Sequence, residues 1–381
     1  MRQTLLRIRL DAFWSTEPIE GITSIGVEYL LLAWTLFGLG WLLWRRLSPR
    51  RSEPQAATTT ETATTETATT ETASLTSSIV FWSVVAGFLL AVPRWAAASF
   101  PNGIPVYGYG FMLLVGFCVG GWLGARRAKQ AGFNGELVWD AAMWIFFGGI
   151  LGARLFYLMQ YHERVFANKQ GIDLLKAAVN LPDGGLVFYG GLILAAVAYL
   201  VFCKTRKLDP LHFADVLVPS VFIGLAFGRI GCLLNGCCYG DRCELPWAIT
   251  FPAHSVPFNA MLSRGFLAPD AIATFPMHPS QIYSSINALV LVVLTSCYFR
   301  YRHHDGSVLA LGWFLYPISR FTIEFLRGDE LGQLNTSLTI SQWVSIGMLV
   351  AWVPFYAYLT LHNRKSISLG TPNDSASVSP A

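Results

Sequence analysis

The chain has 381 residues, of which 53% are hydrophobic and only 13% are charged, and its mean hydropathy is +0.46. Ordinary soluble domains carry about 25% charged residues. So much apolar sequence with so few charges predicts a polytopic membrane protein. The same composition excludes a mainly disordered chain, a coiled coil and a nucleic-acid-binding protein. The net charge of +4 is small, so the placement of the basic residues matters more than their number.

About 20 consecutive apolar residues cross a bilayer as an α-helix. Nine runs are candidate spans, in chain order: 25–44, 79–98, 107–125, 139–160, 186–203, 213–234, 285–299, 308–326 and 340–361. The runs 79–98 and 285–299 carry the weakest signal, and the second of these is short. We therefore predict an all-α polytopic membrane fold.

Basic clusters follow the odd-numbered spans, after residues 44, 125, 203, 299 and 361. Lysine and arginine favour the cytoplasmic side of a membrane. The odd-numbered spans are therefore predicted to run from outside to inside, which places the N-terminus outside and the C-terminus in the cytoplasm. Arg2, Arg7 and Arg9 favour the opposite orientation, but the cluster after the first span is stronger.

The N-terminal region separates into three predicted parts. Residues 1–45 hold a first extra transmembrane helix, and residues 79–98 hold a second. Between them, in residues 46–78, the pentapeptide TTETA occurs three times in succession. This polar repeat has no apolar periodicity, so we predict a disordered cytoplasmic linker, with a phosphorylated or protein-binding tether as the alternative. Residues 362–381 have similar composition and predict a disordered cytoplasmic tail.

Ionisable residues inside membrane spans are costly and usually functional. The notable residues of this kind lie toward the outer ends of the predicted spans: Arg154, Arg229, Arg320, Glu324 and, at a span end, Arg327. The last three are spaced i, i+4 and i+7 and share one helix face. Four arginines against one glutamate at one depth predict a pocket for an anion, and the abundant anion there is a phospholipid phosphate. The alternative is that these arginines only extend to the outer headgroups.

Four of the seven cysteines cluster near the end of the sixth span: Cys232, Cys237, Cys238 and Cys243. Their spacing lacks the paired C-x2-C of usual structural zinc sites. On an oxidising outer side, a disulfide is natural. Free packing thiols and a metal site are the alternatives. Cys118, Cys203 and Cys297 lie in predicted spans and are expected to be small core residues.

The segment GRIGCLLNGCCYG, residues 228–240, resembles the signature of the prolipoprotein diacylglyceryl transferase family, which reads roughly G-R-x-G-N-F-x-N-x-E-x-x-G. Five residues match it: Gly228, Arg229, Gly231, Asn235 and Gly240. Cys232 and Cys237 depart from it, because they stand where the family usually has asparagine and often has glutamate.

Further segments resemble the family's other motifs in the same order: Tyr109–Met112, Gly152–Leu155, Phe188–Ile193, His278–Tyr283 and Arg320–Arg327. The resemblance covers residues 104–361, which correspond to the family's seven-helix core. The two N-terminal spans and the repeat linker lie outside it.

The resemblance implies an enzyme that moves the diacylglyceryl group of phosphatidylglycerol to the lipobox cysteine of a preprolipoprotein and releases glycerol 1-phosphate, the first step of lipoprotein maturation. It implies a multi-pass protein of the bacterial cytoplasmic (inner) membrane, with its active site toward the outer leaflet, and neither a metal nor an organic cofactor. Its partners are the lipid bilayer, phosphatidylglycerol and the signal peptide of the substrate lipoprotein, with no nucleic acid.

Carried onto this sequence, the family's site predicts catalytic roles for Arg229, Arg320 and Tyr189. Arg229 is expected to bind phosphate through two parallel hydrogen bonds, and Arg320 to stabilise developing charge or to lower the pKa of the thiol. The other predicted substrate-binding residues are Tyr109, Asn235, Arg154, Glu324, Arg327 and His278.

Tyr189 stands where the family often has a catalytic histidine. A phenol is a poorer base than an imidazole at neutral pH, so Tyr189 either orients lipid through its hydroxyl or acts as proton acceptor in the arginine-rich pocket. His278 is the other candidate acceptor. Its Pro-Ser-Gln context also fits a structural loop histidine that caps the next helix.

Three alternatives to the transferase remain. A divergent paralogue with another substrate would share its motifs. An anion or lipid transporter would also use intramembrane arginines and glycine-broken helices, although the internal repeat typical of that class is missing. A membrane thiol–disulfide protein would use the cysteines, but it needs a C-x-x-C pair or a quinone.

Overall fold

The computed structural model describes residues 4–9, 23–26, 29–30, 32–37, 40, 104–167, 171–179, 184–302, 304–328, 332–333 and 335–369, with side chains up to Leu361. The chain divides into two units, residues 2–110 and residues 111–381, which we describe separately.

The first unit contains a small sheet that the sequence analysis did not predict. Its strands are β1 (Thr4–Arg9), β2 (Ser24–Gly26) and β3 (Ile104–Tyr107), in the order β2-β1-β3. β1 pairs in parallel with β2 and antiparallel with β3. The predicted span 25–44 is therefore wrong at its start, because residues 25 and 26 belong to β2. Residues 29–30, 32–37 and 40 are helical, whereas the linker, the span 79–98 and the end of the tail lie outside the described residues.

The second unit is helical, which confirms the predicted all-α polytopic membrane class. Its long helices are α3 (Gly108–Gln130), α4 (Glu136–Gln160), α7 (Phe188–Thr205), α8 (Pro210–Asn235), α10 (Ser280–Tyr301), α11 (Ser307–Glu324) and α12 (Ile340–Leu369). The first three residues of α3 belong to the first unit. Six of the described helices, all of the long helices except α11, are long and apolar enough to cross a membrane. The predicted run 285–299 was too short at its start, because α10 begins at Ser280 and the polar residues that precede the run, Ser280, Gln281 and Ser284, are buried within the helix.

Small residues let the long helices approach closely. α4 packs mainly against α7, where a Cβ at Gly152 would collide with the carbonyl oxygen of Gly190. α3 approaches α8 in the same way, since a Cβ at Gly120 would lie 3.0 Å from the carbonyl oxygen of Ser220. Such contacts between small residues are a main source of helix association in membranes.

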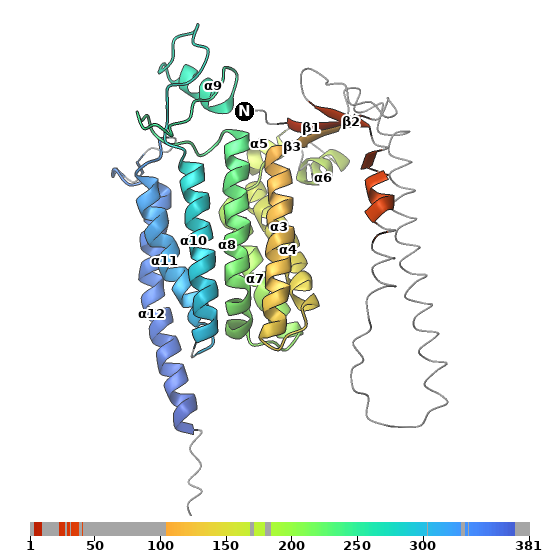
Figure 1. Ribbon diagram of the computed structural model, residues 1–381, viewed down its shortest axis with the longest axis vertical. Coiled ribbons are helices and arrows are strands. Elements are labelled where there is room, and N and C mark those ends of the chain that lie inside the picture. The colour runs from red at the N-terminus through yellow and green to blue at the C-terminus, as the bar shows by residue number, and fades with distance from the viewer. Residues whose placement is uncertain are drawn as a thin grey trace, which may run out of the picture. The chain divides into compact units, whose positions relative to one another are not determined.

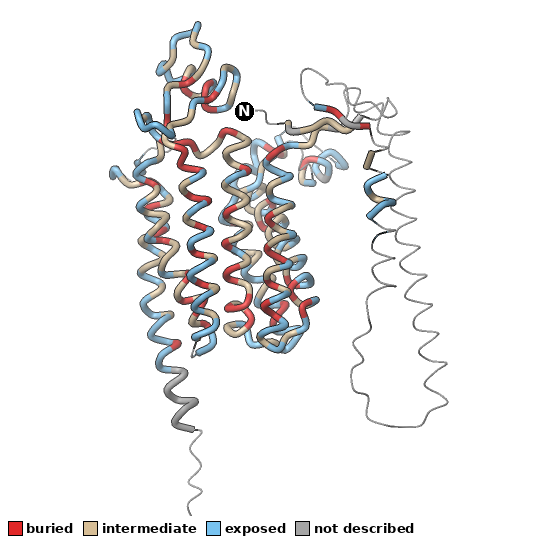
Figure 2. The backbone as a smooth tube through the Cα atoms, in the orientation of Figure 1, coloured by how far each residue is buried: buried red, intermediate tan, exposed pale blue. Residues whose placement is uncertain are grey.

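α8 lies between the α4–α7 pair and the group formed by α10, α11 and α12 (Figure 1). Asp209 begins α8 by accepting hydrogen bonds from the backbone N–H groups of Leu211 and His212, and Pro210 fills the first helical position. Both features are typical of a helix start. Buried residues follow the inward faces of α8 and α10 (Figure 2).

The segment 236–279 connects α8 to α10 and includes the short helix α9 (Val256–Ser263). It has its own apolar cluster of Tyr239, Phe251, Met261 and Met277. Backbone hydrogen bonds join Gly240 N–H to the His278 carbonyl at 3.1 Å and Asp241 N–H to the Leu326 carbonyl at 2.9 Å. These bonds hold together the end of α8, the start of α10 and the end of α11.

Candidate active site

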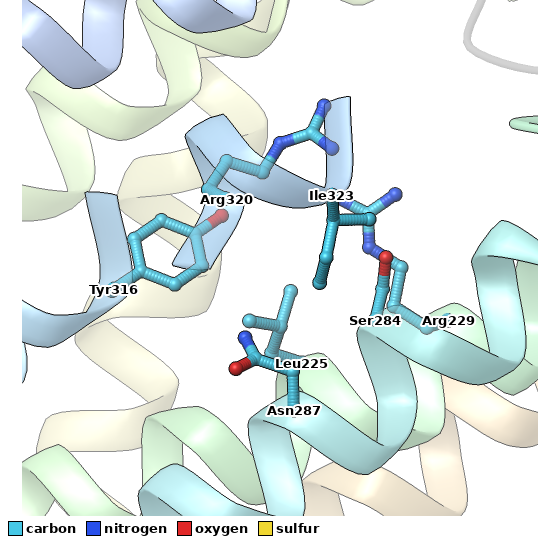
Figure 3. A pocket seen from close by; sticks show the side chains of 7 residues that line it. All are labelled: Leu225, Arg229, Ser284, Asn287, Tyr316, Arg320 and Ile323. Carbon is cyan, nitrogen blue, oxygen red and sulfur yellow. The ribbon is translucent and has the colours of Figure 1, made fainter. Parts of the chain in front are cut away.

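A pocket lies between α8, α10 and α11, a short distance inside the ends that the segment 236–279 connects. It is lined by Leu225, Arg229, Ser284, Asn287, Tyr316, Arg320 and Ile323 (Figure 3). The guanidinium groups of Arg229 and Arg320 lie toward one side of it, and the Asn287 carboxamide lies toward the other (Figure 3). The lining of the pocket therefore contains two positively charged groups and several neutral groups that can form hydrogen bonds.

Glu324 organises the positive groups contributed by α11 and the residues just after it. Its fully buried carboxylate lies 2.7 Å from Nη1 of Arg320 and 3.4 Å from Nη1 of Arg327. The Thr339 hydroxyl donates a 3.0 Å hydrogen bond to its other oxygen, and Nη2 of Arg320 donates to the Ser341 hydroxyl at 3.0 Å. The predicted i, i+4 pair is present, and one carboxylate serves two arginines.

Arg229 differs from these arginines in its surroundings. Within the described part of the chain, no carboxylate forms an ion pair with it. The positive charge of Arg229 also acts on Arg320, whose guanidinium lies toward the same side of the pocket. Arg229, Arg320 and Arg327 carry three positive charges against the single negative charge of Glu324, so the described residues give this region an excess suited to an anion.

Three polar residues of the pocket were missed by the sequence analysis: Ser284, Asn287 and Tyr316. Asn287 donates a 2.9 Å hydrogen bond to the Ser319 hydroxyl. Tyr316 precedes Arg320 by four residues, so its position on the same helix face was a usable signal. Ser284 and Asn287 are three residues apart on α10, but nothing local indicated which face of α10 meets α8 and α11.

Arg154 lies in α4, away from the residues that line the pocket, and its guanidinium contacts backbone carbonyls. Its buried guanidinium donates hydrogen bonds of 2.7–3.0 Å to four backbone carbonyls, those of Ala177, Ala178, Gly184 and Gly185. The first two end the short helix α6 (Ile172–Val179), where a cation is favourable. Arg154 is therefore engaged in holding the chain between α6 and α7, and it is not one of the pocket-lining residues.

The remaining predicted residues lie outside the pocket lining. Tyr189 is the second residue of α7 and is 44% exposed, with its ring against Phe188. Tyr109 is the second residue of α3 and belongs to the first unit. His278 does not cap α10 as predicted, because Pro279 occupies the cap position and Nδ1 of His278 instead lies 3.4 Å from the Tyr283 hydroxyl.

Asn235 ends α8, and its side chain contacts the thiol of Cys237. All seven cysteines are free thiols in the structure, so the predicted disulfide is not formed. Hydrogen bonds with the Cys232 and Cys238 thiols hold the pKa of Cys237 well below that of an ordinary thiol. Cys232, Cys237 and Cys238 also lie close enough together to hold a metal ion. Among the described residues, no other group of three or more His, Cys, Asp or Glu side chains does so.

Comparison with known proteins identifies the family. The family model described as prolipoprotein diacylglyceryl transferase matches residues 96–358. A phosphatidylglycerol–prolipoprotein diacylglyceryl transferase of Rhodopirellula baltica is 30% identical over 380 residues, covering 72% of this chain and 77% of the relative. A protein of the same name from Clostridium tetani is 34% identical over 248 residues, covering 65% of this chain and 91% of the relative. Since the match spans more than half of the chain and includes the helices that form the pocket, the chain belongs to the prolipoprotein diacylglyceryl transferase family.

Proposed function

We propose that this enzyme transfers the diacylglyceryl group of phosphatidylglycerol to the lipobox cysteine of preprolipoproteins, the first step of their maturation, and releases glycerol 1-phosphate. One observation carries the proposal. Arg229, which has no carboxylate partner among the described residues, lies with a second arginine, Arg320, toward one side of a pocket that also has polar side chains in its lining (Figure 3). A phosphate group has the charge and the geometry to bridge them.

The reaction forms a carbon–sulfur bond and breaks the bond between the glycerol carbon and the phosphate oxygen. The cysteine must lose its proton, because the thiolate is the nucleophile. The departing phosphate gains negative charge, which fixed positive groups stabilise in a site shielded from water. Arg229 binds the phosphate, and Arg320 stabilises the charge that develops on it.

The ion pair with Glu324 has a positioning role in this scheme. It leaves Arg320 charged but fixes its direction, so the guanidinium is arranged before the lipid arrives. Arg327 shares the same carboxylate and adds positive charge near the pocket. Arg154, whose guanidinium donates to backbone carbonyls, positions the chain that leads into α7.

We also propose that the pocket faces the outer leaflet of the bacterial cytoplasmic membrane. Arg229 lies six residues from the end of α8 and Arg320 four residues from the end of α11. At 1.5 Å per residue, both lie about 6–9 Å inside the helix ends, a depth that suits a lipid headgroup. The opposite helix ends carry the basic clusters, which favour the cytoplasm and place the C-terminus there.

A reconstituted assay tests the proposal. Purified protein is placed in vesicles containing phosphatidylglycerol and given a peptide with a lipobox cysteine, and the peptide mass is measured. A diacylglyceryl mass increase that disappears in Arg229→Ala, or when the peptide cysteine is replaced by serine, supports it. A folded wild-type protein that leaves the peptide unchanged contradicts it, and lipid or anion movement across the vesicle in the same preparation would favour a transporter.

A further inference from the structure

Three cysteines that the proposed reaction does not use meet at the end of α8. The Sγ atoms of Cys232, Cys237 and Cys238 all lie within 4.8 Å of one another, and each residue is partly buried. Cys232 is in the last turn of α8, one turn beyond Arg229, and the other two follow the helix end directly. The fourth cysteine of the region, Cys243, is outside this thiol trio.

The backbone explains why the thiol trio forms. Gly236 caps the end of α8 with a left-handed φ of 79°. The N–H of Gly236 bonds to the Leu233 carbonyl at 3.1 Å, and that of Cys237 bonds to the Cys232 carbonyl at 3.1 Å. This pair of bonds is the Schellman arrangement, which folds the chain back on the last helical turn. It therefore brings Cys237 back to Cys232.

The start of α10 fixes the other side of the thiol trio. Nε2 of Gln281 donates to the Cys237 carbonyl at 2.8 Å, and the Ser280 hydroxyl donates to the Cys238 carbonyl at 2.7 Å. Both donors are 1% exposed. Oε1 of Gln281 is buried and has no hydrogen-bond partner within the described residues. A buried acceptor without a partner is costly, so a donor is expected beside this oxygen.

We propose that Cys232, Cys237 and Cys238 form a three-thiolate site for Zn²⁺. Zinc–sulfur bonds of about 2.3 Å in a tetrahedron place sulfurs about 3.8 Å apart, so the three atoms need to approach by no more than about 1 Å. Each thiol gives its proton to solvent as the bond to zinc forms, and nothing is oxidised or reduced. A disulfide would instead use two sulfurs and leave the third without a partner.

Three protein ligands leave the fourth zinc position for water. Zinc bound in this way joins the last turn of α8 to the chain beyond Gly236. It therefore stabilises the helix end that carries Arg229 and Asn235, independently of the reaction catalysed in the pocket.

Metal content measured on the full chain tests the site without reference to activity. The protein is purified in detergent with a reductant, stripped with a chelator, exposed to zinc and separated from free metal. We expect about one zinc ion per chain in the wild type, almost none in Cys232→Ser, Cys237→Ser or Cys238→Ser, and the wild-type content in the matched control Cys243→Ser. Cobalt in place of zinc should give the intense absorption of sulfur-to-cobalt charge transfer.

The cobalt spectrum of the wild type keeps the test decisive even where a serine variant fails to fold. Reduced wild-type protein that retains no zinc, or that binds cobalt without the thiolate absorption, overturns the proposal. Equal zinc in the wild type and in a folded variant lacking all three thiols also overturns it. So does a disulfide within the thiol trio whose reduction restores free thiols but no metal binding.

Discussion

Glu324→Gln removes one negative charge from a buried network while it keeps the shape of the side chain. The Glu324 side chain is fully buried and that of Arg320 is 11% exposed, with 2.7 Å between the charged atoms. Breaking a buried ion pair by neutralising one partner costs about 3–5 kcal/mol of unfolding free energy, because the other charge stays buried. For a domain of this size, that corresponds to a fall in melting temperature of roughly 6–20 °C.

An exposed pair of similar geometry supplies the matched control. Nη2 of Arg206 lies 2.9 Å from Oδ2 of Asp140, and both side chains are about half exposed. Exposed ion pairs contribute about 0–1 kcal/mol, so Asp140→Asn is expected to change the melting temperature little. The two pairs differ in burial far more than in distance, which makes burial the variable that the comparison tests.

The same variants are then assayed for transfer to the lipobox peptide. Glu324→Gln is expected to lower the rate about ten- to a hundredfold, because Arg320 loses the contact that directs it toward the pocket. Arg320→Ala should lose more, and the double variant should lose little beyond it, because the two residues act together. A Glu324→Gln variant that melts and reacts like Asp140→Asn, or fully additive losses in rate, would contradict the positioning role of Glu324.

Three other substitutions test separate parts of the molecule. Arg229→Lys should insert normally but lose most of its transfer rate, because an ammonium group cannot make two parallel hydrogen bonds to phosphate; near-normal transfer would exclude that role. Tyr189→Phe should lose about tenfold at most, with an unchanged pH profile, as expected for one neutral hydrogen bond; a collapse in rate, with rescue and an acid-shifted profile in Tyr189→His, would instead identify the phenol as the proton acceptor. Gly152→Ala should lower the melting temperature, because the added methyl group meets the Gly190 carbonyl. The control Gly347→Ala, where the added methyl group meets open space, should be neutral or stabilising by about 0.5–1 kcal/mol. Equal melting temperatures of the two variants would contradict the close packing of α4 and α7.

The helices of the second unit were predictable because bilayer crossing imposes a length and an apolar composition that can be read locally. Their ends were less predictable. The apolar span was predicted to begin at residue 285, whereas α10 begins at Ser280, as the Pro-Ser-Gln context after His278 indicated. The polar side chains of Ser280, Gln281 and Ser284 are buried, and their hydrogen-bond partners include distant carbonyls such as those of Cys237 and Cys238.

The three-stranded sheet could not be predicted from the sequence, since β1 and β3 pair across almost one hundred residues. Strand pairing at that separation depends on how the whole chain folds, and no short-range pattern records it. The second extra span and the repeat linker, which lie outside the described residues, remain predictions.

The sequence by itself determined the pairing of Arg320 with Glu324, because residues four apart on a helix are neighbours whatever surrounds them. Only the tertiary structure decided the different situations of Arg154 and Arg229. Both are arginines of apolar helices, yet one donates to four backbone carbonyls and the other lines a pocket. A buried guanidinium takes whichever acceptors the packing of distant segments brings within about 3 Å, and helix spacing holds no information about those segments.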